Sequence, residues 1–196
     1  MYQPKLICMG IIAAPLEDVC SAVQLQLERT IGRDAFNSKL QKAIWREFFR
    51  NDGQFYDIMR AEIVLFSPRQ GITAYACNLA DGWLSLYENH VKARTFDAYF
   101  FRATLAEHAE YKVFEMISWR HGIRVRQVRA LQEEDGWQFL NKGDPLPFED
   151  LERYKKHQVS ARMNRKLIES YSAEAGYQIN SVTEFAGQCW RFWKGD

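Results

Sequence analysis

Two blocks of basic residues have the side-chain types and spacing needed to bind an acidic partner. Guanidinium and ammonium groups bind phosphates and carboxylates through charge-assisted hydrogen bonds. A fold that brings the two blocks together would create one positive surface for phosphates or for an acidic protein. The alternative is a charged outer face that neighbouring acidic residues compensate. The candidate partner-binding residues of the two blocks are Arg120, Arg124, Arg126, Arg129, Lys155, Lys156 and Arg162.

Two acidic clusters have residues that could bind a divalent metal or share a proton. The first lies in a predicted hairpin turn. The second lies at the beginning of a predicted helix, where carboxylates interact favourably with the helix dipole. Solvated or capping roles are therefore favoured over a catalytic one. The clusters consist of Glu133, Glu134 and Asp135, and of Asp144, Glu149, Asp150 and Glu152.

The sequence has none of the motifs that mark several large enzyme classes. It lacks a Gly-rich phosphate loop, an HExxH zinc motif, an EF-hand loop and a GxSxG nucleophile elbow. Cys8, Cys20, Cys77 and Cys189 are far apart, which favours buried free thiols over a zinc site. We therefore expect no catalytic residue, no cofactor and no metal. A metal-dependent hydrolase or nuclease with a scattered acidic site stays open as an alternative.

The length and composition are those of a folded protein whose net charge produces no strong electrostatic field. A chain of 196 residues suits one domain, and 47% hydrophobic with 14% aromatic residues excludes disorder for most of it. The formal net charge of +1 means that any electrostatic function must come from local patches. No apolar run approaches the roughly 18 residues that a membrane helix needs, and no signal peptide is recognisable. We therefore expect a cytoplasmic protein.

The hydrophobic pattern predicts a single α+β domain over residues 1–196, with a mainly antiparallel sheet and helices packed on it. Residues 1–60 have the pattern of a strand followed by two helices, the second beginning near Asp34 and ending at residues 51–53. Residues 61–196 have the pattern of a hairpin, a helix from Asp81, a further strand, a three-stranded meander and C-terminal helices.

The tripeptide Asp-Gly-Trp occurs at residues 81–83 and again at 135–137. Asp81 follows a predicted strand and precedes a predicted helix, which is the place of an N-cap. Asp135 and Gly136 lie between two predicted strands and fit a hairpin turn, in which glycine adopts a left-handed conformation at little cost. The same three letters therefore serve two different turns, and we assign them no shared catalytic role.

The middle strand of the meander changes its alternation pattern along its length. Ile123 and Val125 alternate with Arg124 and Arg126, but the apolar residues further along have the other parity. A β-bulge near Gln127 would restore a common buried face and leave both arginines outside the core.

Nucleic-acid binding ranks below protein binding, because it requires exposed aromatic residues among the arginines for base stacking. The pattern instead places Trp119 and Tyr154 inward.

After the meander, the pattern predicts two helices separated by a break at residues 157–160, with Ser160 as a cap and Gly176 as the stop. The tail that follows contains Trp190, Phe192 and Trp193. Three large aromatic residues so close together should pack on the body of the protein or on a partner. A homodimer formed through this tail is one expectation.

Residues 72–176 resemble a group of small, largely uncharacterised bacterial proteins of the kind found as immunity partners in toxin systems. The motifs are a strand into NLADGW, an arginine-rich middle strand, WQFLNKGDPLPFEDLERY and RMNRKLIESYSAEAGYQI. The resemblance implies inhibition of a toxin by tight binding, which needs no catalytic residue. The matching residues, interpreted as specifying the fold, are Asp81, Gly82, Trp83, Gly143, Pro147, Phe148, Glu149, Tyr154 and Arg162.

The leading prediction is therefore a protein-binding protein without catalysis, of which a toxin-inhibiting immunity protein is the specific form. The arginine strand and the basic helix are its expected contact surface. Two other classes stay open: a metal-dependent hydrolase or nuclease, and a nucleic-acid-binding protein that uses the same basic blocks.

Overall fold

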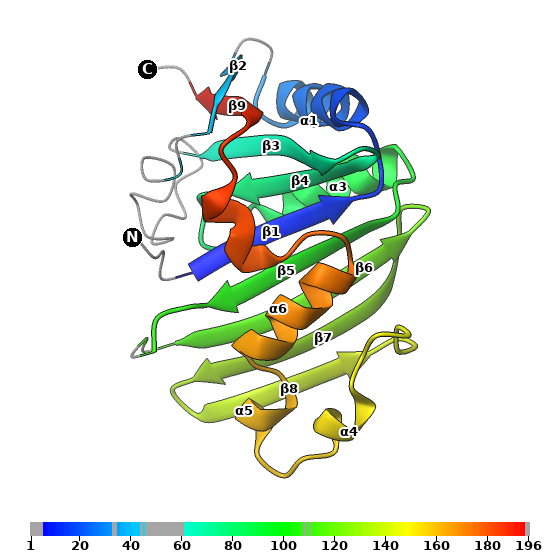
Figure 1. The fold of residues 1–196 in the computed structure, drawn as a ribbon, viewed down its shortest axis with the longest axis vertical. Coiled ribbons are helices and arrows are strands. Elements are labelled where there is room, and N and C mark those ends of the chain that lie inside the picture. Colours follow the sequence, from blue (N-terminus) through cyan, green and yellow to red (C-terminus); the bar gives the residue numbers. More distant parts are fainter. Residues whose placement is uncertain are drawn as a thin grey trace.

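The protein is built on one nine-stranded antiparallel sheet, with strand order β2-β9-β3-β4-β1-β5-β6-β7-β8 (Figure 1). The structure, a computed structural model, describes residues 6–32, 35–43, 45, 61–107, 109 and 111–194. This architecture confirms the predicted α+β class. The strands are β1 (Leu6–Ile12), β2 (Phe36–Lys42), β3 (Glu62–Arg69), β4 (Ile72–Cys77), β5 (Ala98–Thr104), β6 (Lys112–Arg120), β7 (Ile123–Glu133), β8 (Gly136–Lys142) and β9 (Gln188–Lys194).

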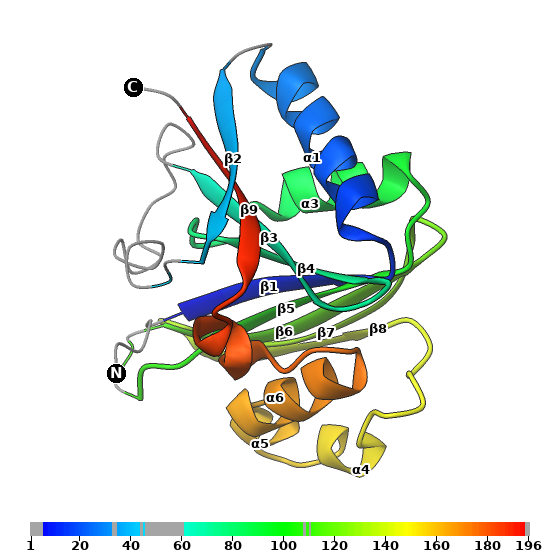
Figure 2. The same ribbon diagram turned by 45° about the horizontal axis from the view of Figure 1, so that its top comes forward.

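Helices cover the two faces of this sheet over different strands. Figure 2 shows α1 and α3 on one side of the sheet and α4, α5 and α6 on the other. None of the helices in the described ranges is both long and apolar enough to cross a membrane. The helices are α1 (Leu16–Thr30), α3 (Leu84–Ala93), α4 (Leu151–Tyr154), α5 (Val159–Arg162), α6 (Arg165–Glu174) and the 3₁₀ helix η2 (Ile179–Glu184).

Strand β1 lies in the middle of the sheet and contributes to a core on each face. Ile7, Met9 and Ile11 pack in the core under α6 and η2, whereas Cys8 and Ile12 pack in the core under α1 and α3. Because both faces of the strand are covered, almost every residue in it is apolar. This explains why the sequence shows a continuous apolar run here rather than an alternating one.

Most of the predicted elements are confirmed, including β1, α1, the β3–β4 hairpin, β5 and the β6–β7–β8 meander. The bulge in the meander lies at Val125, close to its predicted place, because Ser118 pairs with Arg126 while Trp119 pairs with Arg124. Gly136 has φ +111° at the β7–β8 turn, as expected for a glycine that closes a hairpin.

Strand β2 is the main error in the predicted secondary structure. Residues 36–42 were expected in a helix with Phe36 and Leu40 inward, but they pair along their whole length with β9. Leu40 is 45% exposed. The ring centroids of Phe36 and Trp83 lie 5.9 Å apart. The rest of the expected helix lies almost entirely outside the described residues. A strand at the sheet edge is formed here by its partner rather than by local propensity.

The aromatic tail provides that partner strand. It packs on the body of the protein as β9, between β2 and β3, with Phe192 buried and Cys189 buried on the opposite face. The expectation that the tail packs is therefore confirmed. Dimerisation through it stays a prediction.

The C-terminal helices are shorter and more numerous than predicted. The break after α4 is confirmed, but α5 is a single turn, and a second break follows it before α6. Ser160 does not cap a helix. Asn164 does, because its side chain accepts a hydrogen bond from the Leu167 N–H. Gly176, with φ +127°, follows the end of α6 as predicted.

Asp81 closes a turn just before α3 rather than capping the helix itself. Its Oδ1 accepts a hydrogen bond from the Trp83 N–H at 2.8 Å, and Gly82 and Trp83 both have positive φ. A side chain at Gly82 would collide with Cys8 and Phe100, which explains the glycine. The turn thereby places the Trp83 ring in the core under α1 and α3.

Replacing Trp83 with alanine is expected to lower the free energy of unfolding by about 3–5 kcal/mol, because this buried ring leaves a large cavity. Trp137→Ala is the matched control and should cost less, since Trp137 is only half-buried. Chemical denaturation followed by circular dichroism measures both. Equal losses would contradict the different burial of the two rings.

Candidate functional site

Arg126 is buried, so the prediction that it lies outside the core is wrong. Only 1% of the residue is exposed, and its guanidinium is fully enclosed. Nε and Nη2 donate to the two carboxylate oxygens of Glu149 at 2.8 and 2.6 Å. Nη1 donates to Asn141 Oδ1 and to the Gly143 carbonyl, each at 2.7 Å. These bonds use the arginine within the fold and leave it unable to reach a partner.

Glu149 is buried at the other end of this pair, so a solvated or capping role for it is also wrong. Its carboxylate accepts hydrogen bonds from the Leu146 N–H and from the Tyr154 hydroxyl, each at 2.8 Å. Burial raises the pKa of Tyr154 and of Tyr171, whose hydroxyls lie 3.3 Å apart, so both hydroxyls stay neutral; the Tyr171 oxygen accepts from the Asp150 N–H at 2.8 Å. The network ties the connector after β8 and helix α4 to strand β7.

The bulge at Val125 sends the neighbouring arginines to opposite faces. Arg126 lies on the face with Val128 and Ala130, under the C-terminal helices. Arg124 lies on the other face, where its guanidinium stands 5.8 Å from the Trp119 ring centre. Trp119 itself is 1% exposed, as expected for an inward residue.

Among the described residues, no helix covers that second face over β7 and β8. Figure 1 shows α4, α5 and α6 in front of the β6–β8 strands and no described helix behind β7 and β8. Cross-strand partners share a face, so the register places the side chains of this surface. We call it the open surface, and its charged and amide side chains are Arg102, Arg124, Gln127, Arg129, Glu133 and Lys142, with the buried Glu115 among them.

A chain of polar contacts begins at α3 and enters the open surface. Lys92 Nζ lies 3.4 Å from Glu88 Oε1, and Arg124 Nη2 donates to Glu88 Oε2 at 2.9 Å. Arg124 Nη1 donates to Gln127 Oε1 at 3.4 Å. Burial by itself would raise the pKa of Glu88, but Arg124 and Lys92 outweigh it, and the pKa is lowered. Glu88 is therefore ionised at neutral pH and orients Arg124.

The chain continues across the sheet to β5. Gln127 Nε2 donates to Glu115 Oε1 at 3.0 Å, and Arg102 Nη2 donates to Glu115 Oε2 at 2.9 Å. Glu115 is only 1% exposed, while Arg102 Nε is buried without a hydrogen-bond partner among the described residues. Arg129 lies directly across from Glu115 and is partly exposed. These hydrogen bonds hold the side chains of Gln127, Glu115 and Arg102 in place.

The remaining predicted contact residues lie elsewhere. Arg120 sits near Tyr99, on the side of the C-terminal helices, and pairs with Asp97 at 3.2 Å. Arg162 stacks on Phe139 at 5.2 Å and donates from Nε to the Lys156 carbonyl. Lys155 pairs with Glu152 in solvent. The two basic blocks therefore do not form one surface: Arg124 and Arg129 belong to the open surface, and the others do not.

The described cysteine, histidine and acidic side chains were expected to form no metal site. None of them form a group of three or more His, Cys, Asp or Glu side chains that could hold a metal. Burial raises the pKa of Cys20 and of Cys77 to about 12 and also raises that of Cys8. Because the thiolate is the reactive form of cysteine, these thiols are poor nucleophiles.

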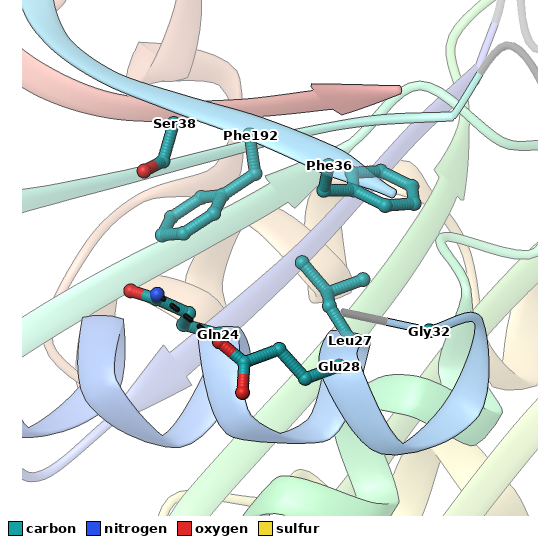
Figure 3. Close-up of a pocket in the computed structure, with 7 residues that line it drawn as sticks. All are labelled: Gln24, Leu27, Glu28, Gly32, Phe36, Ser38 and Phe192. Atoms are coloured by element: carbon teal, nitrogen blue, oxygen red, sulfur yellow. Dashed lines mark hydrogen bonds between the residues drawn. The ribbon is translucent and has the colours of Figure 1, made fainter. Parts of the chain in front are cut away.

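Two depressions lie near helix α1. The first, enclosed by α1, β2 and β9, has a volume of about 70 Å³ (Figure 3). This is room for about two waters at roughly 30 Å³ each, whereas ligand pockets usually have about 300–1,000 Å³. Its lining residues are Gln24, Leu27, Glu28, Gly32, Phe36, Ser38 and Phe192.

The second depression is wider, about 410 Å³, and open to solvent where α1 meets the segment after α3. Asp18, Ser21, Arg94 and Phe96 line it, and the Ser21 hydroxyl donates to the Glu17 carbonyl of its own helix. Neither depression contains a histidine or a pair of carboxylates, so we place the candidate site on the open surface.

Comparison with known proteins gives no further guide: no family model, no curated protein and no solved structure matches this chain.

Proposed function

We propose that this protein binds an acidic protein through the open surface and performs no catalysis. The observation that carries the proposal is the group of cations on and beside a sheet face that no described helix covers over β7 and β8, of which Arg102 and Arg124 are ordered by hydrogen bonds. Around this face, the five cations Lys92, Arg102, Arg124, Arg129 and Lys142 outnumber three carboxylates, Glu88, Glu115 and Glu133. The excess positive charge would attract an acidic partner and disfavour the binding of basic proteins.

A protein suits this surface better than a nucleic acid. Leu131 and Leu140 are partly exposed on the same face, and they give it apolar area beside the arginines. Arginines around an apolar centre are typical of protein interfaces. Trp119, the aromatic ring under Arg124, is too deeply buried to stack on a base.

Inhibition of a bacterial toxin is the specific form of binding that we propose. It rests on the resemblance of residues 72–176 to immunity partners. An inhibitor of this kind occludes its target with a rigid surface, and preordered side chains lower the entropy cost of binding. The contacts from Lys92 to Arg102 supply such order.

The Arg124→Glu/Arg129→Glu variant is expected to lose partner capture by at least about tenfold, roughly 1.4 kcal/mol, because each reversal repels an acidic partner. The tagged protein is purified from a lysate of its native cell after nuclease treatment, and the co-eluting proteins are quantified by mass spectrometry. Lys155→Glu/Lys156→Glu is the matched control, with two reversals in exposed residues away from the open surface.

The control variant should retain the partner, and both variants should keep the thermal midpoint of the wild type within a few degrees. Equal retention by the two variants would remove the open surface from the proposal. If only the control variant loses the partner, the binding site lies on the basic segment after α4 and not on the open surface.

A further inference from the structure

In the part of the chain that the structure describes, strand β8 is the last strand of the sheet and has no strand on its outer side. Among the described strands it pairs only with β7, and its backbone forms no hydrogen bond to the backbone of any other described segment; the Lys142 carbonyl also accepts from Arg126 Nη1 at 3.2 Å. Alternate residues of an edge strand direct their N–H and C=O groups away from the sheet. The seven residues Gly136–Lys142 therefore present a template for another strand.

This edge lacks the features that usually keep an edge strand from pairing. The strand has no proline and no register shift, and its one charged residue, Lys142, is the last in the strand. Trp137, Phe139 and Leu140 are all partly exposed. The other edge strand, β2, is different, because Lys39 lies at its centre and most of its residues are exposed and polar. A long, partly apolar edge without protection is a site of strand addition.

The charges along β8 are self-complementary. Its first residue follows the exposed acidic turn Glu133–Asp135, and its last residue is the exposed Lys142. When two copies of such a strand run antiparallel about their common midpoint at Phe139, Lys142 of each faces the acidic turn of the other. The same operation on β2, which has two lysines and no acid, would bring only like charges together.

We propose that two copies of this chain associate through antiparallel pairing of their β8 strands. The main-chain bonds supply the affinity, as in other cases of strand addition, and the charges at the strand ends fix the direction. A twofold axis perpendicular to the sheet relates the two copies. The two open surfaces then lie on the same side of one continuous sheet. This pairing is independent of what the open surface binds.

Sedimentation equilibrium over a range of protein concentrations tests the proposal. We expect the wild type to be a dimer, and Lys142→Glu to weaken the dimer at least tenfold because glutamate would face the acidic turn. Asp135→Lys should weaken it similarly, and the double variant Asp135→Lys/Lys142→Glu should restore it. Lys39→Glu is the matched control, because it makes the same reversal on the opposite edge strand and should leave the dimer unchanged.

Hydrogen exchange of the peptide covering residues 136–142 locates the contact. Its amides should exchange faster in Lys142→Glu than in the wild type, while amides of the central strand β1 stay equally protected. A monomeric wild type at all concentrations would overturn the proposal, since the edge would then be free for a different chain. A dimer that Lys142→Glu leaves intact would place the contact elsewhere and overturn it equally.

Discussion

Replacing Arg126 with methionine is expected to lower the free energy of unfolding by about 3–5 kcal/mol, one of the largest losses for a single substitution in this protein. The change leaves the Glu149 carboxylate in the core without its cation. Removing one partner of a buried ion pair costs this much because the remaining charge is desolvated without compensation. Chemical denaturation monitored by circular dichroism gives the loss directly.

Two further variants separate burial from charge. Arg124→Met removes an arginine from the same strand, but its pair with Glu88 is partly exposed, so the loss should stay within about 1 kcal/mol. Arg126→Met/Glu149→Leu removes both charges of the buried pair and should recover much of the stability. If Arg126→Met and Arg124→Met cost the same, the buried network does not stabilise the fold as described.

Stability is expected to fall by up to about 5 kcal/mol as the pH drops from 6.5 to 3, because His90 must be protonated in a buried site. Burial lowers the pKa of His90 from its ordinary 6.5 to about 3. The unfolded chain therefore binds a proton at a higher pH than the folded chain. The contribution of His90 to the free energy of unfolding is complete above pH 6.5. It is lost at about 1.4 kcal/mol per pH unit until the pH reaches the pKa of His90 in the folded protein.

The surroundings of His90 explain this shift. Its Nδ1 lies 3.0 Å from the Leu86 carbonyl, which can only accept, so Nδ1 carries the proton of the neutral ring. Nε2 is buried without a hydrogen-bond partner among the described residues, and the Tyr75 and Tyr87 rings pack beside it. A second proton on Nε2 would place a charge among these rings with no acceptor for it.

His90→Phe removes this titration, whereas His157→Gln changes an exposed histidine and serves as the control. Unfolding free energies measured at several pH values between 7 and 3 should fall less steeply for His90→Phe than for the wild type and the control. Parallel curves for all three proteins would show that other groups cause the acid sensitivity.

Elements defined by local pattern could be predicted from the sequence. The meander alternates apolar and polar residues between turns that contain Gly122 and Gly136, and these signals need no distant contact. The bulge was also recognisable, because a change of parity within one strand requires an extra residue. The position of the bulge determines which face of the sheet each arginine lies on. Arg126 shares the parity of Val128 and Ala130, and this was the one local sign that it belongs to the buried face.

Features that depend on distant residues could not be predicted in the same way. Glu149 lies 23 residues from Arg126, and no sequence period connects a strand residue with a buried carboxylate in a connector. The chain of contacts on the open surface joins α3, β5, β6 and β7 and exists only once the sheet has formed. Strand β2 has a composition compatible with a helix, and only β9 makes it a strand.

The position of β9 also sets the order in which the chain can assemble during synthesis. Its residues leave the ribosome long after those of β2 and β3, yet they lie between these two strands in the sheet. Until then β2 has no neighbour, and the apolar strand β3 is itself an edge. Contacts so far apart in the sequence form slowly. We therefore expect this corner of the sheet to fold last, and a nascent or shortened chain to offer the edge of β3 to chaperones and proteases.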